Sequence, residues 1–235
     1  MQRSANLLLR KVSDLLSRDE PEPSPLPIPD HLIALASPQG VAMLAGSPLI
    51  GDYLRLAPHF EPQISPKFCG PATLAICLNA LGLPPPATAD AVRPRFSQTN
   101  VFTPRTEAVR GRDMVEREGM GLAVFAEFAA AHGARPEARF AGDGSLEAFR
   151  SLAREVLADT RRHMAVNYLR PALGQEGKGH TSPLAAYDEE SDRFLVLDVS
   201  RVRYPPVWVR AEDLFAAMNT RAGANTRGFA IVGKA

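Results

Sequence analysis

Residues 62–82 read PQISPKFCGPATLAICLNALG, and this stretch places a cysteine between a loop and an apolar helix. The apolar residues from Ala72 to Leu81 have helical spacing and are compatible with one long buried face. Pro71 suits a first helical turn, where no N–H is needed, and Gly82 suits the position after the last turn. The spacing therefore predicts a helix that begins near Pro71 and has Cys69 at its N-terminus.

Cys69 has the local setting of a reactive cysteine. The free backbone N–H groups and the dipole at a helix N-terminus favour the thiolate, which is the nucleophilic form. The alternative is that Cys69 is a small buried hydrophobic residue, as most free cysteines are. A catalytic role therefore requires partner residues elsewhere in the chain.

Composition excludes several classes of protein. The chain has 235 residues, 45% of them hydrophobic, and a net charge of +1 without a basic block, so a nucleic-acid partner is not expected. Cys69 and Cys77 are about 12 Å apart along one predicted helix, too far for a mutual disulfide. No stretch is long enough for a membrane span, and the three-leucine run before Arg10 is too short for a signal peptide.

The pattern along the chain predicts an α+β protein. Residues 1–30 read as an amphipathic helix and a proline-rich tether, and residues 31–235 as a single catalytic domain. In that domain a helical half, about 31–160, would pack against an antiparallel sheet, about 161–235, with a cleft at their junction. The clearest elements are helices at Gly121–His132 and Ser145–Arg161, with Ser145 as N-cap, and strands at His163–Leu169, Thr181–Tyr187, Phe194–Val199 and Gly228–Val232.

His180 and Asp198 are the candidate partners of Cys69, because a thiolate is usually paired with a histidine that a third group orients. His180 follows Gly177 and Gly179 and opens a predicted strand, whereas Asp198 interrupts the next apolar strand. A hairpin centred on Glu189 would place His180 opposite Asp198, with Cβ atoms about 5 Å apart.

An ordinary structural role is the alternative for each of these two residues. His180 could be a core histidine with a hydrogen bond, and Asp198 a strand-end carboxylate bound by the backbone or by Arg201. A different loop type would also shift the register of the hairpin.

Gln63 completes the candidate site. Attack on an amide creates an oxyanion, and the Gln63 side chain together with the Cys69 backbone N–H could stabilise it. A surface glutamine is the alternative. The order Gln, Cys, His, acid is that of papain-like cysteine peptidases, although the papain signature C-G-S-C-W is absent.

Four blocks of sequence resemble the catalytic domain of phytochelatin synthases. The similarity starts near residue 36, is patchy between 84 and 160, and has no counterpart in the first 30 residues. The short architecture is similar to that of the bacterial phytochelatin-synthase-like proteins. The blocks are FCGPATLAICLNALG from residue 68, GKGHTSPLAAYD from 177, LDVSRVRYPPVWV from 197 and RGFAIV from 227.

The resemblance implies a papain-like fold and an acyl-enzyme reaction on glutathione. Cys69 would attack the amide between cysteine and glycine, His180 would transfer the proton and Asp198 would orient the imidazole, with Gln63 in the oxyanion hole. Water or a second glutathione would then resolve the γ-glutamylcysteinyl enzyme, giving γ-glutamylcysteine or a phytochelatin.

The substrate is an anion, so cationic side chains should bind it. The candidates are Arg201 and Arg227, with Tyr204 and Gly179 beside them; for the two arginines, ion pairs that only support the fold are the alternative. No metal site or cofactor is expected in the protein. Cd²⁺ or Zn²⁺ would instead arrive as a thiolate complex of glutathione.

Two other functions compete with this hypothesis. One is a papain-like peptidase or amidase that acts on other peptides, and the other is a non-catalytic protein that binds thiols or heavy metals. Two cysteines without a C-x-x-C pair argue against the second. We expect a cytoplasmic protein, with an exported form and a homodimer as open alternatives.

Overall fold

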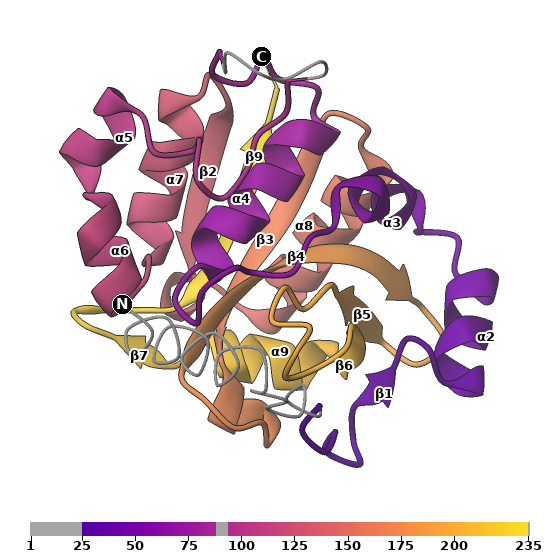
Figure 1. The fold of residues 1–235 in the computed structure, drawn as a ribbon. Helices are drawn as coiled ribbons and strands as arrows, with labels where there is room; N and C mark the ends of the chain where they lie inside the picture. Colours follow the sequence, from indigo (N-terminus) through magenta and orange to yellow (C-terminus); the bar gives the residue numbers. More distant parts are fainter. Residues whose placement is uncertain (1–24, 88–93, 235) are drawn as a thin grey trace, which may run out of the picture.

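A seven-stranded sheet forms the centre of the computed structural model, which describes residues 25–87 and 94–234 (Figure 1). The order of its strands is β1-β6-β5-β4-β3-β9-β2, and every neighbouring pair is antiparallel. The α+β class expected from the sequence is thereby confirmed. The strands are β1 Ile33–Ala34, β2 Arg135–Phe140, β3 Arg162–Leu169, β4 Gly179–Asp188, β5 Arg193–Val196, β6 Val207–Arg210 and β9 Gly228–Gly233, and a separate hairpin pairs β7 Arg221–Ala222 with β8 Asn225–Thr226.

Helices cover both faces of the sheet. In Figure 1, α4 lies in front of β3 and β4, whereas α8 lies behind them and α9 lies below. Successive residues of β3 alternate between two cores: Ala165 belongs to the core with α4, and Met164 and Val166 to the core with α8 and α9. The helices are α2 Pro38–Gly46, α3 Gly51–Leu56, η1 Ala57–His59, α4 Cys69–Ala80, α5 Pro104–Val109, α6 Arg112–Glu118, α7 Leu122–Ala131, η2 Ala141–Asp143, α8 Leu146–Ala158, η3 Arg170–Leu173 and α9 Ala211–Met218.

Helix α4 is more deeply enclosed than the sequence pattern predicts. Every residue from Cys69 to Leu78 is buried, rather than the residues of one face only. The sheet beneath it presents Ala165, Ala185 and Ala230, whose short side chains leave room for a close approach. As predicted, the chain leaves the helix at Gly82, which has φ of +62°. A helix this buried holds its first residue, Cys69, in a fixed place.

Four elements differ from the expected division into a helical and a strand-rich half. Strands β1 and β2 lie in the first half, and helices η3 and α9 in the second. Because β2 is an edge strand with mostly exposed side chains, its sequence RPEARF lacks the alternation that marks a half-buried strand. The predicted helices at Gly121–His132 and Ser145–Arg161 and the four predicted strands from His163 onward are confirmed apart from shifts at their ends. The Ser145 N-cap is also confirmed, since its Oγ accepts from the N–H of Ala148.

The predicted register of the β4–β5 hairpin is wrong. Asp188 pairs with Arg193, so the loop is centred beyond Glu189, and a bulge follows between Leu184 and Ala186. Strand β5 ends at Val196, two residues before Asp198. His180 is therefore opposite Tyr168 of β3 in the sheet, and Asp198 reaches it from a loop.

Several predictions fall wholly or partly outside the described residues. The N-terminal amphipathic helix lies in 1–24, and of the proline-rich tether only residues 25–30 are described, without helix or strand. The boundary of the catalytic domain near residue 31 stays a prediction. Within the described ranges, no helix combines the length and apolarity needed to cross a membrane.

Gly228 tests how tightly the sheet is packed next to the candidate site. A Cβ at this position would lie 2.0 Å from the backbone oxygen of Arg139 in β2. We expect Gly228→Ala to lower the free energy of unfolding by about 2–3 kcal/mol, because overpacking against backbone cannot relax easily. Urea unfolding measures this. The matched control is Gly144→Ala, where a Cβ meets nothing within 4 Å and a change below about 0.5 kcal/mol is expected. Equal losses for the two variants would contradict the tight packing.

Candidate active site

Cys69 is the first residue of α4 and lines a cavity of about 860 Å³. Its side chain is buried, with 8% of the residue exposed. No side chain caps this helix end, so backbone N–H groups of the first turn are available to the sulfur. The hydroxyl of Thr73, one turn later, donates to the carbonyl of Thr181 at 3.0 Å. This bond holds the helix of the cysteine against the strand that carries His180.

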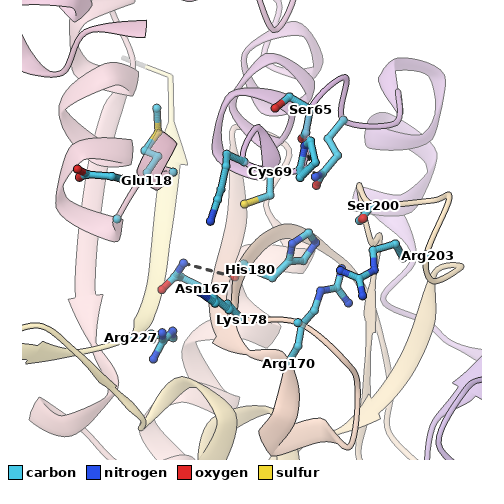
Figure 2. A pocket seen from close by; sticks show the side chains of 18 of the residues that line it. Ser65, Cys69, Glu118, Asn167, Arg170, Lys178, His180, Ser200, Arg203 and Arg227 are labelled. Atoms are coloured by element: carbon cyan, nitrogen blue, oxygen red, sulfur yellow. Dashed lines mark hydrogen bonds between the residues drawn. The ribbon is translucent and has the colours of Figure 1, made fainter. Parts of the chain in front are cut away.

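His180 and Asp198 form a buried pair beside Cys69. The His180 Nε2 lies 2.9 Å from Asp198 Oδ1, and the other side of the ring interacts with the Cys69 thiol. Figure 2 shows the Cys69 sulfur and the His180 ring facing the same space. Because Nε2 is bound to the carboxylate, Nδ1 is the ring atom left for the sulfur. Cys69 and its two suggested partners, His180 and Asp198, thus form a continuous set of contacts.

Arg170 also binds Asp198, which the sequence reasoning missed. Its Nη2 lies 2.8 Å from each carboxylate oxygen, and the backbone N–H of Ser200 donates to Oδ1 at 2.8 Å. The Arg170 guanidinium is itself held by Gln175 Oε1 at 2.8 Å and lies 5.0 Å over the ring of Tyr204. Because a buried aspartate needs a charged partner, Asp198 itself indicated that a cation would lie beside it. The sequence did not indicate which arginine this would be.

These contacts shift three pKa values in the directions that a thiolate–imidazolium pair requires. Burial raises the pKa of the Cys69 thiol, but the hydrogen bond and charge of His180 outweigh it, and the pKa is lower than that of an ordinary cysteine. Burial lowers the pKa of His180, and Asp198 more than offsets this. The charges of His180 and Arg170 hold the pKa of Asp198 well below its usual range despite its burial. By contrast, burial strongly raises the pKa of Cys77.

Gln63 lies on the cavity wall near Cys69. Its backbone N–H donates to Val199 O at 2.8 Å, and its side-chain Nε2 donates to Ser65 O at 2.8 Å. An amide nitrogen carries two hydrogens, so one N–H is left for an acceptor in the cavity. This position suits the predicted oxyanion role together with the backbone N–H of Cys69.

The cavity wall is rich in cations. Arg227 lines it, and burial lowers the pKa of Arg227 without an acidic partner among the described residues. A Cβ on Gly179 would lie 3.1 Å from Nε and Nη2 of Arg227, so the glycine leaves the space that the guanidinium occupies. Among the lining residues in the described ranges, the charged side chains are Lys67, Glu118, Arg170, Lys178, Arg203 and Arg227.

Arg201 and Tyr204 do not line this cavity, which differs from the sequence-based prediction. The Arg201 guanidinium lies 5.4 Å over the ring of Phe60, and Tyr204 is 1% exposed. The Tyr204 hydroxyl accepts from the N–H of Glu176 at 2.7 Å, behind Arg170. The turn after Asp198 instead points Arg203 into the cavity (Figure 2). The sequence blocks identified the loop after Asp198, but the conformation of its turn determines that Arg203, rather than Arg201, faces the cavity.

Asn167 is a further cavity residue that sequence reasoning missed. It lies on β3, and its Nδ2 donates to Thr181 Oγ1 at 2.8 Å, which leaves its oxygen without a partner in the described residues. Asn167 and Arg227 lie on the same side of Cys69 in Figure 2. A cation and an acceptor on one side of the cysteine suit a ligand with both a carboxylate and an ammonium group.

A second buried histidine–aspartate pair lies outside the cavity. His163 Nδ1 is 3.1 Å from Asp52 Oδ2, and both side chains are fully buried. Neither lines the cavity of Cys69. In the described part of the chain, no group of three histidine, cysteine or acidic residues could hold a metal ion.

Comparison with known proteins agrees with the four blocks found in the sequence. The family model described as phytochelatin synthase matches residues 24–229. Glutathione gamma-glutamylcysteinyltransferase 3 of Lotus japonicus is 32% identical over 207 residues, which are 86% of this chain and 42% of that protein. Glutathione gamma-glutamylcysteinyltransferase 1 of Arabidopsis thaliana is 29% identical over 77% of this chain and 37% of its own length. The chain thus spans less than half the length of these relatives.

One solved structure extends the comparison. The peptidase domain of Streptococcus ComA is 15% identical and covers 74% of this chain and 97% of its own, with a TM-score of 0.46.

The reactivity of Cys69 tests the electrostatics of the site. We expect iodoacetamide to alkylate Cys69 rapidly below about pH 8.5, the ordinary pKa of a cysteine, because the lowered pKa leaves a thiolate there. The thiolate forms as pH rises through the Cys69 pKa, and the imidazolium is lost only when pH passes the raised pKa of His180. Mass spectrometry of alkylated protein across pH measures the rate. Cys69→Ala is the control, since buried Cys77 should not react; a Cys69 rate that rises only above about pH 8.5 would refute the ion pair.

Proposed function

Because the chain belongs to the phytochelatin synthase family, we propose that it cleaves the amide between cysteine and glycine in glutathione through Cys69. The observation that carries the proposal is the buried contact of Cys69, His180 and Asp198 at the wall of a cation-rich cavity. Glutathione also appears in the names of the relatives, glutathione gamma-glutamylcysteinyltransferases.

Acylation follows from the protonation state of the site. The Cys69 thiolate attacks the carbonyl carbon of the cysteine residue of glutathione, and the oxyanion accepts hydrogen bonds from Gln63 and the Cys69 backbone N–H. As the C–N bond breaks, the His180 imidazolium gives its proton to the departing glycine amine. Asp198 keeps the imidazole in the tautomer and orientation that this transfer needs. The product is a γ-glutamylcysteinyl thioester on Cys69.

Two acceptors can resolve the thioester. Neutral His180 takes a proton from water, or from the amine of a second glutathione, as that nucleophile attacks and the C–S bond breaks. Water gives γ-glutamylcysteine, and glutathione gives a phytochelatin. The proposal assigns both outcomes to the same intermediate.

Arg227 is proposed to bind the α-carboxylate of the γ-glutamyl group. Its Nη1 donates to Thr220 Oγ1 at 3.1 Å and to Arg221 O at 2.6 Å. Its Nε and Nη2 have no acidic partner in the described residues and are left for an anionic ligand in the cavity. The oxygen of Asn167, on the same side of Cys69 in Figure 2, would accept from the ammonium group. Gly179 would contribute by leaving space for the guanidinium.

The reaction as proposed needs no resident cofactor. Cd²⁺ or Zn²⁺ would enter as a thiolate complex of glutathione, as part of the substrate. All residues invoked belong to one chain, so the chemistry does not depend on a homodimer. We place the reaction in the cytoplasm, where glutathione is abundant.

The acyl-enzyme is the first testable consequence. Mixed with glutathione, the protein should release glycine and gain the mass of one γ-glutamylcysteinyl group, because the thioester forms before it is resolved. Intact-protein mass spectrometry, with and without Cd²⁺, detects the adduct, and the ratio of γ-glutamylcysteine to longer peptide gives the fate of the thioester. Cys69→Ala should neither release glycine nor gain mass, whereas Cys77→Ala should release glycine and gain mass as the wild type does.

Results of that experiment also separate the competing functions. Cleavage of other peptides but not of glutathione would favour a general peptidase or amidase. Stoichiometric Cd²⁺ binding without any turnover would favour a metal-binding protein.

The role of Arg227 makes a second prediction. We expect Arg227→Ala to lower kcat/KM for glutathione about 10- to 100-fold, because a charge-assisted hydrogen bond to the substrate is lost. Steady-state glycine release measures this. The matched control is Arg221→Ala in the neighbouring β7–β8 hairpin, where the Arg221 guanidinium binds the carbonyl of Ala224. If the Arg227 variant is as active as the control, Arg227 does not bind the substrate.

A further inference from the structure

We propose that the leaving-group side of the cavity is built for an apolar residue, so that the enzyme prefers γ-glutamylcysteinyl peptides that end in a leucine-like residue over glutathione, which ends in glycine. The inference rests on the proposed function, because it names the substrate class of the same site. Three observations carry it: the orientation of the substrate, two exposed apolar side chains held on the cavity rim, and a cation beside them.

The orientation follows from the chemistry. His180 must give its proton to the departing amine, so the third residue of the substrate lies on the His180 side of Cys69. Figure 2 places Arg227 and Asn167 on one side of Cys69, and Ser200 and Arg203 on the other side, beyond His180. If the γ-glutamyl group lies at Arg227, the leaving residue lies toward Ser200 and Arg203.

Ile64 and Val202 also line the cavity. Ile64 is on the loop before Cys69, and Val202 is on the loop after Asp198, between Ser200 and Arg203 in the sequence. The two loops are joined by the hydrogen bond from the N–H of Gln63 to Val199 O. Ile64 is 61% exposed and Val202 52%. Of the exposed large hydrophobic side chains in the described residues, these two line the cavity. Scattered exposed hydrophobic residues are ordinary, but two that face one active-site cavity form a surface that a ligand can cover.

Both side chains are held in place by their backbones. The N–H of Ile64 donates to Oε1 of buried Gln98 at 2.9 Å, and Gln98 Nε2 donates to Pro62 O at 2.9 Å. Val202 lies in a turn closed by the bonds from the N–H groups of Arg203 and Tyr204 to Ser200 O. Because these loops are already ordered, covering the two side chains does not require the loops to order on binding.

Arg203 supplies the matching charge. A peptide that ends at its third residue carries a carboxylate next to the apolar side chain. Arg203 lines the same part of the cavity, and its ion pair with Glu176, at 3.6 Å, is exposed on both sides. An exposed pair of this kind is weak, so the guanidinium can bind the substrate carboxylate instead.

Glycine leaves this surface uncovered. It has a carboxylate for Arg203 but no side chain for Ile64 and Val202. A leucine at the same position removes apolar surface from water on both partners. Because the site is a rim rather than an enclosed pocket, we expect a preference of about 10-fold, at the low end of what a hydrophobic pocket gives per group.

The experiment compares kcat/KM for γ-Glu-Cys-Gly, γ-Glu-Cys-Leu and γ-Glu-Cys-Asn, in which asparagine has nearly the shape of leucine but is polar. All three give the same thioester on Cys69, so differences in kcat/KM report only on the leaving residue. We expect the leucine peptide to exceed both others about 10-fold. In Val202→Ser and Ile64→Ser, the ratio of leucine to asparagine should fall toward one. Val41→Ser, at a valine of 55% exposure on α2, should keep the wild-type ratio.

The outcomes separate this inference from the function on which it rests. Glycine release from glutathione, with the leucine peptide cleaved no faster than the asparagine peptide, overturns the apolar subsite and leaves the proposed function standing. An unchanged ratio in both rim variants also overturns it. If the wild type forms no thioester from any of the three peptides, the proposed function fails and the inference fails with it. Both rim side chains are exposed, so the serine variants leave the core intact.

Discussion

The site depends on one buried charge, the carboxylate of Asp198. An isolated carboxylate in a protein interior is very costly, so its neighbours must compensate it. Arg170 compensates it permanently, and His180 does so when protonated. The three residues come from the loop after β5, from η3 after β3 and from β4, so their charges hold three parts of the sheet together at one end. Removing Asp198 would leave Arg170 and His180 without their shared anionic partner.

This arrangement also explains how a buried cysteine can be a thiolate. The charge of Arg170 works against an imidazolium, as burial does. The charge and hydrogen bond of Asp198 outweigh both effects and raise the pKa of the imidazole. The imidazolium in turn stabilises the sulfur anion, with help from the backbone N–H groups of Thr181 and Gly70. Cys77 lies two turns further along the same helix without such partners, and its pKa moves the other way. Position on the helix and a charged neighbour, rather than residue type, account for the opposite pKa shifts of the two cysteines.

Sequence reasoning brought His180 and Asp198 together through a wrong geometry. It paired His180 with Asp198 across a hairpin, whereas the true register and the bulge put Tyr168 opposite His180, and Asp198 arrives from beyond the end of β5. It selected Arg201 from the correct block, but the turn closed on Ser200 O directs Arg203 to the cavity and leaves Arg201 against Phe60. Arg170 and Asn167 were missed because nothing local distinguishes them: their roles arise from contacts with residues 28 and 14 positions away.

The sequence by itself determined the helix that begins at Cys69 and indicated His180 and Asp198 as the residues that lie beside this cysteine. These features depend on local signals, namely the loop-to-helix transition at Cys69, the capping glycine, and an unusual histidine and aspartate in apolar stretches. Only the tertiary structure decided which arginine neutralises Asp198, which cations face the cavity, and that Ile64 and Val202 share its rim. Those properties depend on sheet register, turn conformation and the approach of distant segments, all of which are set by packing of the whole chain rather than by the residues nearby.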